Sequence, residues 1–164
     1  MKWDYEFDVV VVGSGNGALT SAICSHDGGA KTLVIEKSNQ YGGTSATSGG
    51  GVWIPNNRYA KAENVDDSDQ DARDYINSVS PEGMIKDELI ETYISEGPKM
   101  IDYLHENSQV KYRNLSHYPD YFPDNPGGKE GNRSMEPEPI NGTILGTDLG
   151  LSLIHISEPT RPLH

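Results

Sequence analysis

Short apolar runs and glycine-rich turns follow one another in the first part of the chain in the order strand, helix, strand. The run from Phe7 to Val12 is continuous and rich in β-branched residues, which predicts a strand covered on both faces in a parallel sheet. Glycines between Gly13 and Gly17 interrupt this run, and Ala18 to Ser25 can then continue as a helix. Thr32 to Ile35 predicts a second strand, so the segment is a βαβ unit and the fold class is α/β.

Apolar residues recur at helical spacing in the middle of the chain. They predict two amphipathic helices, at Asp87 to Ser95 and Lys99 to Asn107, and a further helix is expected before them, at Asp69 to Val79. Gly97 and Pro98 separate the two amphipathic helices, and we expect a kink or a break there because proline lacks the backbone N–H of a helix interior.

Loops are expected in three other places. Tyr41 to Asn57 is rich in Gly, Ser and Thr, and Val110 to Glu138 is rich in Pro, Tyr and Asn, so both predict little regular structure. The acidic run from Glu63 to Asp74 reads as a solvated loop that leads into a helix. We therefore expect a helical and loop insertion to begin at about residue 58.

Charge and composition exclude several classes of partner. The formal net charge is -12, from 25 acidic and 13 basic residues, and such a surface repels nucleic acid and anionic membranes. The single cysteine, Cys24, cannot form an intramolecular disulfide and favours a reducing compartment. No basic, apolar leader and no run of about 18 apolar residues is present, so we expect a cytoplasmic protein without a membrane span. The histidines lack metal-ligand spacing, and no metal is predicted.

The last residues differ in character from the rest. Leu151 to Arg161 resembles the translation of a transposase adapter that is used to prepare sequencing libraries. We therefore exclude residues 151–164 from the fold prediction as an adapter-derived tail and restrict it to residues 1–150. In this interpretation the natural chain continues beyond Gly150, and the sequence is a truncated fragment.

The turn after the first predicted strand fits the pattern G-x-G-x-x-G/A. Its residues are Gly13, Ser14, Gly15, Asn16, Gly17 and Ala18. The pattern follows a buried strand and opens a helix, which is the setting of a Rossmann-type dinucleotide site. Gly15 lets the backbone approach a pyrophosphate, and the helix N-terminus offers unpaired N–H groups to it.

The residues that follow the second predicted strand extend this site. Glu36 stands at the strand's end, where a carboxylate can accept hydrogen bonds from ribose hydroxyls and repels the 2′-phosphate of NADP. The βαβ unit alone does not distinguish FAD from NAD. A second loop of small residues, Tyr41 to Gly51, favours FAD, because its glycines allow close approach to a flat ligand and its hydroxyls can donate to oxygen atoms.

Three stretches together resemble the 3-ketosteroid Δ1-dehydrogenases, which belong to the wider flavoprotein family of fumarate reductase and succinate dehydrogenase. These stretches are the GSGNGA turn, the loop GGTSATSGGGVWIPNN and the later segment YPDYFPDNPGG at Tyr118 to Gly128. The resemblance runs through most of Tyr5 to Gly150 and implies that residues 1–150 are the N-terminal part of an FAD-binding domain, with an incomplete parallel sheet.

The resemblance also assigns roles to single residues. It implies FAD contacts at Gly13, Ser14, Gly15, Asn16, Gly17, Ala18, Glu36, Lys37, Gly42, Gly43, Thr44, Ser45, Ser48, Gly49, Gly50 and Gly51. Membrane-bound relatives attach the flavin through a histidine in the second loop. Residues 37–57 contain no histidine, so we expect FAD to be held non-covalently.

The activity that the resemblance implies is the oxidation of the C1–C2 bond of a 3-ketosteroid. A base removes a proton from C2 and the flavin N5 takes a hydride from C1, while donors polarise the C3 ketone. Tyr121 aligns with an active-site tyrosine that assists the base. The principal base, the ketone-binding donors and the second half of the FAD site lie later in the family's chain, so we expect this fragment alone to be inactive.

Two alternatives stay open from the sequence. One is a fumarate-reductase-like flavoprotein that reduces an enoate, for which arginines outside this sequence would bind the substrate carboxylate. The other is an FAD-binding fragment without catalysis of its own. The electron acceptor is left unassigned, and a small-molecule substrate is the partner that we expect.

Overall fold

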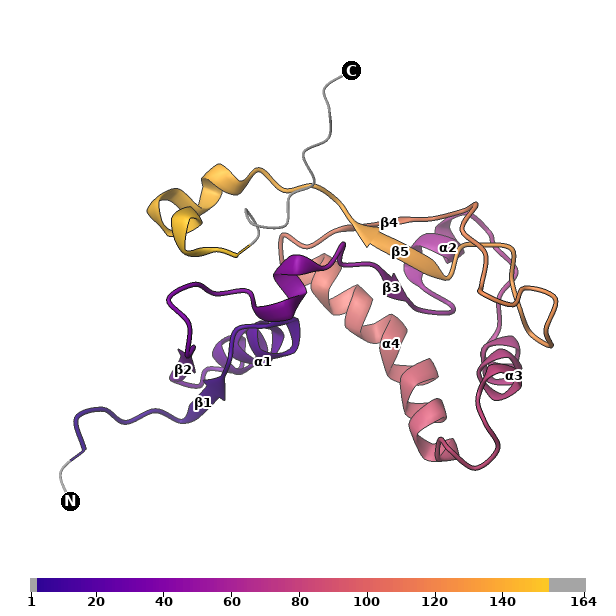
Figure 1. Ribbon diagram of the computed structural model, residues 1–164, viewed down its shortest axis with the longest axis horizontal. Helices are drawn as coiled ribbons and strands as arrows, with labels where there is room; N and C mark the ends of the chain where they lie inside the picture. Colours follow the sequence, from indigo (N-terminus) through magenta and orange to yellow (C-terminus); the bar gives the residue numbers. More distant parts are fainter. Residues whose placement is uncertain (1–2, 154–164) are drawn as a thin grey trace. The chain divides into compact units, whose positions relative to one another are not determined.

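The computed structural model describes residues 3–153, and these fall into two compact units. The first unit contains the residues up to Gly50 together with those from Asn141 onward, and the second contains Gly51–Ile140. Figure 1 labels the helices and strands of each unit. Of the predicted adapter-derived tail, residues 154–164 lie outside the described part of the chain.

The first unit contains the predicted βαβ element. Strand β1 (Val9–Val12) and strand β2 (Thr32–Ile35) pair in parallel, with helix α1 (Asn16–Asp27) between them. This confirms the predicted α/β class with a parallel sheet. The first strand begins two residues later than predicted, at Val9, and the carboxylate of the preceding Asp8 accepts a hydrogen bond from the backbone N–H of Lys31 at 2.8 Å.

The prediction that β1 is covered on both faces is wrong for the described residues. Val11 is buried, whereas Val10 is 52% and Val12 is 78% exposed. The β1–β2 sheet has two strands in this part of the chain, and α1 packs against both of them. Cover for the remaining apolar side chains does not come from the described residues of this unit.

The described part of the first unit also contains the 3₁₀ segments η1 (Gly43–Thr47) and η2 (Gly142–Leu151), the second of which is interrupted at Gly146. Tyr41 exchanges backbone hydrogen bonds with the residues that follow η2: its N–H donates to the carbonyl of Leu151 at 2.8 Å, and its carbonyl accepts from Leu153 at 2.9 Å. The first residues of the predicted tail therefore pair with the loop after β2.

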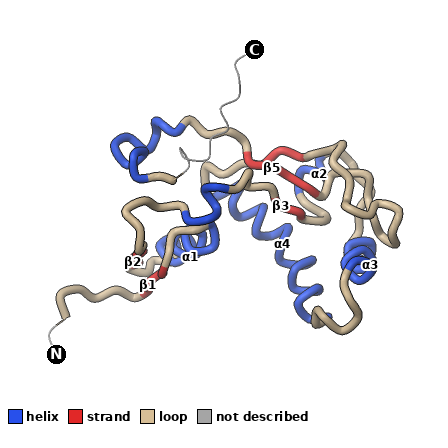
Figure 2. The backbone as a smooth tube through the Cα atoms, in the orientation of Figure 1, coloured by secondary structure: helices blue, strands red, loops and turns tan. Residues whose placement is uncertain are grey.

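The second unit combines three helices with a small antiparallel sheet (Figure 2). Its elements in chain order are β3 (Val52–Trp53), α2 (Arg58–Ala62), α3 (Asp69–Val79), α4 (Asp87–Asn107), β4 (Tyr112–Asn114) and β5 (Ser134–Pro137). The strand order is β3-β5-β4, so the strand nearest the end of the unit lies between the other two. Two small clusters form its core: Ile54, Ile101 and Met135, and Ala72, Ile90 and Ile94.

Helix α4 runs without interruption through Gly97 and Pro98, so the predicted break is absent. Ile94 and Ile101, which flank the proline, are both buried, and burial of their side chains keeps the helix together despite one missing N–H. Gly97 is buried against Ile54, and its lack of a Cβ relieves the crowding that proline imposes on the preceding residue.

Two other expectations for this unit also need correction. The segment predicted to be irregular contains β4 and β5, which are too short to show an alternating pattern. The acidic run is a solvated loop only in part. Its Asp67 side chain is 4% exposed and paired with Arg133, while Ser68 caps α3 by accepting from the Asp71 N–H at 3.0 Å. No helix among residues 3–153 is long and apolar enough to cross a bilayer.

Candidate functional site: a nucleotide-binding turn and an exposed tyrosine loop

The glycine turn between β1 and α1 has the conformation that its sequence predicts. Gly13 has a φ of +96°, a left-handed conformation that favours glycine, and its N–H donates to the Ile35 carbonyl at 2.7 Å. Gly15 is the N-cap of α1 and provides no side-chain cap, and the first turn of the helix holds no acidic residue. The positive end of the α1 dipole is therefore compatible with an anionic group.

Ser14 joins three segments of the predicted site. Its side chain is nearly inaccessible, at 3% exposed, and its hydroxyl donates to Glu36 Oε2 at 2.5 Å. The Ser14 hydroxyl oxygen in turn accepts from the Gly42 N–H at 3.0 Å. One hydroxyl thus links the glycine turn, the end of β2 and the second glycine loop.

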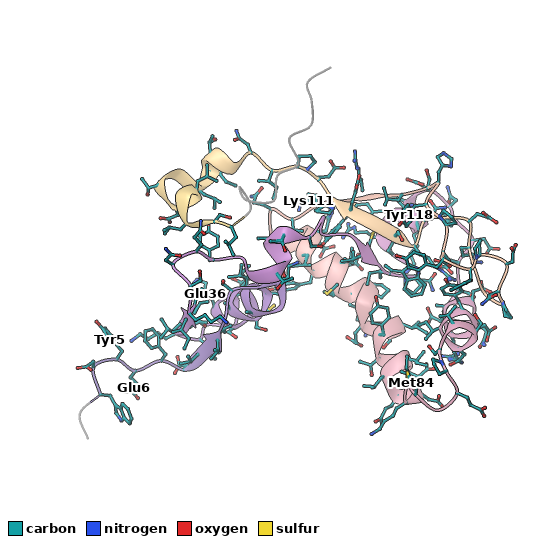
Figure 3. The ribbon with its side chains drawn as sticks, in the orientation of Figure 1. Tyr5, Glu6, Glu36, Met84, Lys111 and Tyr118 are labelled. Carbon is teal, nitrogen blue, oxygen red and sulfur yellow. The ribbon has the colours of Figure 1, made fainter. Side chains whose placement is uncertain are left out.

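Glu36 follows β2 and is labelled in Figure 3. Its second oxygen, Oε1, accepts from the Ser38 N–H at 3.0 Å. The hydrogen bond from Ser14 is the main reason that the pKa of Glu36 lies below its ordinary value, and the bond from Ser38 adds to it. A carboxylate has about four acceptor positions, so the charged group can still accept hydroxyl donors.

The second glycine loop packs directly on the first turn. Gly42 and Gly43 have φ of +123° and +55°, and a Cβ on Gly43 would lie 3.5 Å from the Gly15 backbone. Ser45 Oγ accepts from the Asn16 N–H at 3.0 Å, at the first residue of α1. A narrow layer of backbone with few side chains results, and this is what a pyrophosphate or flat ring needs for close approach.

The remaining predicted cofactor residues differ in how well they join this layer. Gly17 and Ala18 lie in the first turn of α1, and Thr44 lies in η1. Lys37, Ser48 and Gly49 are exposed. Gly50 ends the first unit, while Gly51 belongs to the second, where it lies beside the Met135 carbonyl.

Tyr121, the predicted catalytic residue, lies in the second unit, in the loop between β4 and β5 that also holds Tyr118 (Figure 3). Its side chain is 87% exposed. Both neighbours are tied to the unit: Asp120 is buried and bound to Trp53, and the Phe122 N–H donates to the Tyr75 hydroxyl at 3.3 Å. The loop thus holds its backbone while presenting a phenol to the outside.

A cluster of buried charged side chains under this loop has no signal in the sequence. Arg133 binds Asp67 and Asp120, and all three side chains are at most 4% exposed. Charged residues at three distant positions give no local pattern, so only the fold brings them together. Among residues 3–153, no group of three or more His, Cys, Asp or Glu side chains is placed to hold a metal ion.

The residues around Ser14 fit the adenosine and pyrophosphate end of FAD. Close backbone approach at Gly15 and Gly43, a helix N-terminus without acidic side chains and a charged Glu36 provide the donors and acceptor that this end requires. The class of site that the first unit defines is therefore a dinucleotide site on a βαβ unit.

Comparison with known proteins assigns the family. Residues 8–163 match the FAD binding domain family, and the chain belongs to that family. This confirms the predicted cofactor, FAD. The chain spans about a quarter of the length of the relatives it matches.

Two curated relatives and one solved structure are similar to most of the chain. A 3-oxosteroid 1-dehydrogenase of Mycobacterium tuberculosis is 42% identical over 88% of the chain and 25% of its own length. A 4-oxocyclohexanecarboxylate 2-dehydrogenase of Sinomonas cyclohexanicum is 39% identical over 87% of the chain and 25% of its length. The crystal structure of 3-ketosteroid delta1-dehydrogenase from Sterolibacterium denitrificans, in complex with 1,4-androstadiene-3,17-dione, matches with a TM-score of 0.84 and 39% identity over 90% of the chain and 26% of that protein.

Proposed function

We propose that the protein containing this chain is an FAD-dependent dehydrogenase that introduces a C=C bond beside a ring ketone, and that its substrate is a 3-ketosteroid oxidised between C1 and C2. The observation that carries this proposal is the 42% identity to a 3-oxosteroid 1-dehydrogenase across nearly the whole chain. The second relative, named for an oxocyclohexane substrate, supports the same class of reaction on a smaller molecule with a single six-membered ring. A cytoplasmic location stays a prediction from the sequence.

The first unit would hold the cofactor. The turn from Gly13 to Ala18 and the N-terminus of α1 would bind the pyrophosphate, since they offer backbone N–H groups without competing acids. Glu36 would accept from the ribose hydroxyls, kept in place by Ser14. Gly42 to Ser45 would extend the contact along the pyrophosphate, and Ser48 to Gly51 would reach the flavin ring. The absence of histidine from residues 37–57 supports non-covalent binding.

The reaction removes a proton from C2 and a hydride from C1, and the electron pair of the C2–H bond becomes the new C1=C2 bond. Bound FAD supplies the two-electron acceptor that takes the hydride. Tyr121 would assist the base that takes the C2 proton, because its phenol is exposed to a ligand and can relay a proton through a hydrogen bond. The principal base and the ketone-binding donors would come from outside residues 1–164.

The proposal is tested with the full-length protein, expressed from the source gene read through and beyond the Gly150 codon. Purified holoprotein is mixed anaerobically with 4-androstene-3,17-dione, with 4-oxocyclohexanecarboxylate or with no substrate, and the flavin absorbance is followed. Bleaching by the steroid, with the 1,4-diene as product, supports the proposal. Bleaching only by 4-oxocyclohexanecarboxylate would support the proposed reaction but refute a steroid as its substrate.

A test with fumarate distinguishes the proposed dehydrogenase from a reductase of C=C bonds, which runs the reverse reaction. Holoprotein reduced with a dye is reoxidised by fumarate if the protein is an enoate reductase, and this result without steroid oxidation would overturn the proposal. A natural stop codon after residue 164, together with a stable holoprotein that is inert to all three compounds, would leave an FAD-binding module without catalysis.

A further inference from the structure

The loop that carries Tyr121 is anchored by a cluster of buried charges in the second unit. Arg133 donates through its two terminal nitrogens to Asp120 Oδ2 at 2.9 Å and to Asp67 Oδ1 at 2.7 Å. Its Nε donates to the other oxygen of Asp67 at 3.1 Å. The exposed fractions of the three side chains are 1% for Arg133, 2% for Asp120 and 4% for Asp67.

Neutral donors and aromatic rings complete the cluster. Asp120 Oδ1 accepts from Trp53 Nε1 at 2.6 Å, and its Oδ2 also accepts from the Lys129 N–H at 3.0 Å. Asp67 accepts from the N–H groups of Asn56 and Ser68, each at 3.0 Å. These donors offset the excess of two carboxylates over one guanidinium, since a buried charge is tolerated only when it is paired and hydrogen-bonded.

The guanidinium also contacts two aromatic side chains. The Arg133 Cζ lies 5.4 Å from the centroid of the Trp53 ring and 5.7 Å from that of Tyr75. A lysine could not make the bidentate contact with Asp67 and the two ring contacts at once, because both depend on the planar fork of arginine.

A buried cluster of this kind is expected to contribute little to the free energy of folding. Burying an ion pair costs desolvation energy that the attraction between the charges often fails to exceed, and apolar replacements are frequently as stable. Such a cluster does fix geometry, because each charge has a partner in one arrangement only. What the cluster fixes here is the backbone on both sides of one residue.

That residue is Tyr121. On one side, the Asp120 N–H donates to the Lys129 carbonyl at 2.9 Å, which closes the base of the loop together with the Asp120 side chain. On the other side, the Phe122 N–H is bound to Tyr75, the same residue whose ring contacts Arg133. Farther along, a Cβ on Gly127 would lie 2.0 Å from the Asp71 carbonyl, so the loop lies directly against α3.

The loop backbone is held by hydrogen bonds on both sides of Tyr121, whereas the Tyr121 side chain itself is exposed. Counted over the whole residue, Asp120 is 5% exposed and Tyr121, the next residue, is 87% exposed. We propose that Asp120 and Arg133 are positioning residues for Tyr121, which hold the loop so that the phenol meets the reacting atoms at a set place. This inference rests on the proposed function, in which Tyr121 assists removal of the C2 proton.

A double-mutant cycle in the full-length holoprotein tests it. Asp120→Asn keeps the shape of the side chain but removes its charge, and it would lower kcat for the steroid by about tenfold to a hundredfold, since a misplaced catalytic group costs that much. KM would change by less than about twofold, because binding of the steroid body does not depend on the phenol. In a Tyr121→Phe background, Asp120→Asn would lower kcat by at most about twofold, because its effect passes through the missing hydroxyl.

Two further variants keep this test decisive. Glu91→Gln is the matched control: it removes a carboxylate of the same unit that pairs with Arg73 on the exposed face of α3 and α4, and it would leave kcat unchanged. Trp53→Phe removes the Nε1 donor to Asp120 and keeps an aromatic ring, so it gives a milder version of the same cycle if Asp120→Asn does not fold. An equal fall of kcat in both backgrounds would overturn the inference.

A second measurement separates this inference from the proposed function. If no ring ketone reduces the flavin of the wild-type holoprotein, the proposed function fails, and amide hydrogen exchange decides whether the cluster holds the loop. Asp120→Asn would speed exchange at the N–H groups of Asp120, Phe122, Asn125 and Gly128, which are hydrogen-bonded in the loop, while Glu91→Gln would not. Unchanged exchange in Asp120→Asn would overturn the positioning role whatever the substrate.

Discussion

Replacing Ser14 by alanine should weaken FAD binding although Ser14 need not touch the cofactor through its side chain. The hydroxyl donates to Glu36 and accepts from the Gly42 N–H, so the variant loses the link between the β2 carboxylate and the second glycine loop. Both partners remain, but neither is held against the glycine turn. We expect the loss to appear in the free energy of FAD binding because three segments of the proposed cofactor site depend on this one side chain.

The size of this loss is set by the Gly42 N–H, which is left without its acceptor. The Glu36 carboxylate contributes less because water can replace the lost donor. The Gly42 N–H is partly buried, and an unpaired buried donor costs about 1–3 kcal/mol, with partial access to water placing it near 1 kcal/mol. Since about 1.4 kcal/mol is a tenfold change in an equilibrium constant, Ser14→Ala should raise the Kd for FAD about fivefold to tenfold.

The assay is titration of full-length apoprotein with FAD, followed by quenching of flavin fluorescence. Ser21→Ala is the matched control, because the Ser21 hydroxyl donates to the Gly17 carbonyl at 2.8 Å on the same helix and has no link to Glu36. It should bind FAD as the wild type does. A Kd for Ser14→Ala within twofold of the wild-type value would refute the reasoning, since the linked segments would then not form the site.

The same titration at different pH values provides a second check on the variant. The Ser14 hydrogen bond is the main cause of the lowered pKa of Glu36, so the wild-type carboxylate stays charged to a lower pH than an ordinary glutamate does. Without that bond the pKa rises toward its ordinary value. As the pH falls, FAD affinity should therefore be lost at a higher pH in Ser14→Ala than in the wild type, and coincident profiles would contradict the role of Glu36.

Four further outcomes are expected. Ile101→Ala removes a side chain that is 0% exposed and should destabilise the fold by about 3 kcal/mol, seen as a lower urea midpoint; a change below about 1 kcal/mol would contradict the core assignment. Gly127→Ala should lower the melting temperature more than Gly83→Ala, because both have φ near +70° (+72° and +71°) but only the first would press a Cβ onto the Asp71 carbonyl. Burial lowers the pKa of His105, so the folded state resists protonation, and the free energy of unfolding should fall as the pH drops below 6.5. An NMR titration that gives His105 an ordinary pKa would exclude this pH dependence. Acid precipitation of the holoprotein should release all of the FAD, and flavin left on the protein would show a covalent bond.

The βαβ unit could be predicted because its signals are local. A continuous β-branched run, a glycine turn and a second apolar run each fall within a few residues, and β1 and β2 pair in parallel as these signals predict. Helix α3 has the bounds that the sequence predicts, Asp69–Val79, and Ser68 caps its first turn. Most of the candidate cofactor residues come from these local patterns.

Elements that depend on distant partners could not be predicted. Strand β3 has two residues, β4 three and β5 four, and a strand that short has no measurable alternation. The continuity of α4 through Pro98 depends on burial of Ile94 and Ile101 against the rest of the unit, which the local sequence does not show. The partners Asp67 and Arg133 are 66 positions apart, so their pairing exists only in the folded chain.

The glycine turn between β1 and α1 and the loop that carries Tyr121 are held in place in the same way. In each, a nearly inaccessible polar residue, Ser14 or Asp120, stands directly before a residue that meets a ligand in the proposed function, Gly15 or Tyr121. In each, that polar residue binds segments far away in the sequence: Ser14 reaches Glu36 and Gly42, and Asp120 reaches Trp53 and Arg133. A buried polar group without partners is costly, so these arrangements persist only where every partner is in place. Motifs in the sequence identify the proposed ligand-contacting residues, because glycine and tyrosine follow recognisable patterns, whereas the residues that hold them are recognised only by their burial and their bonds.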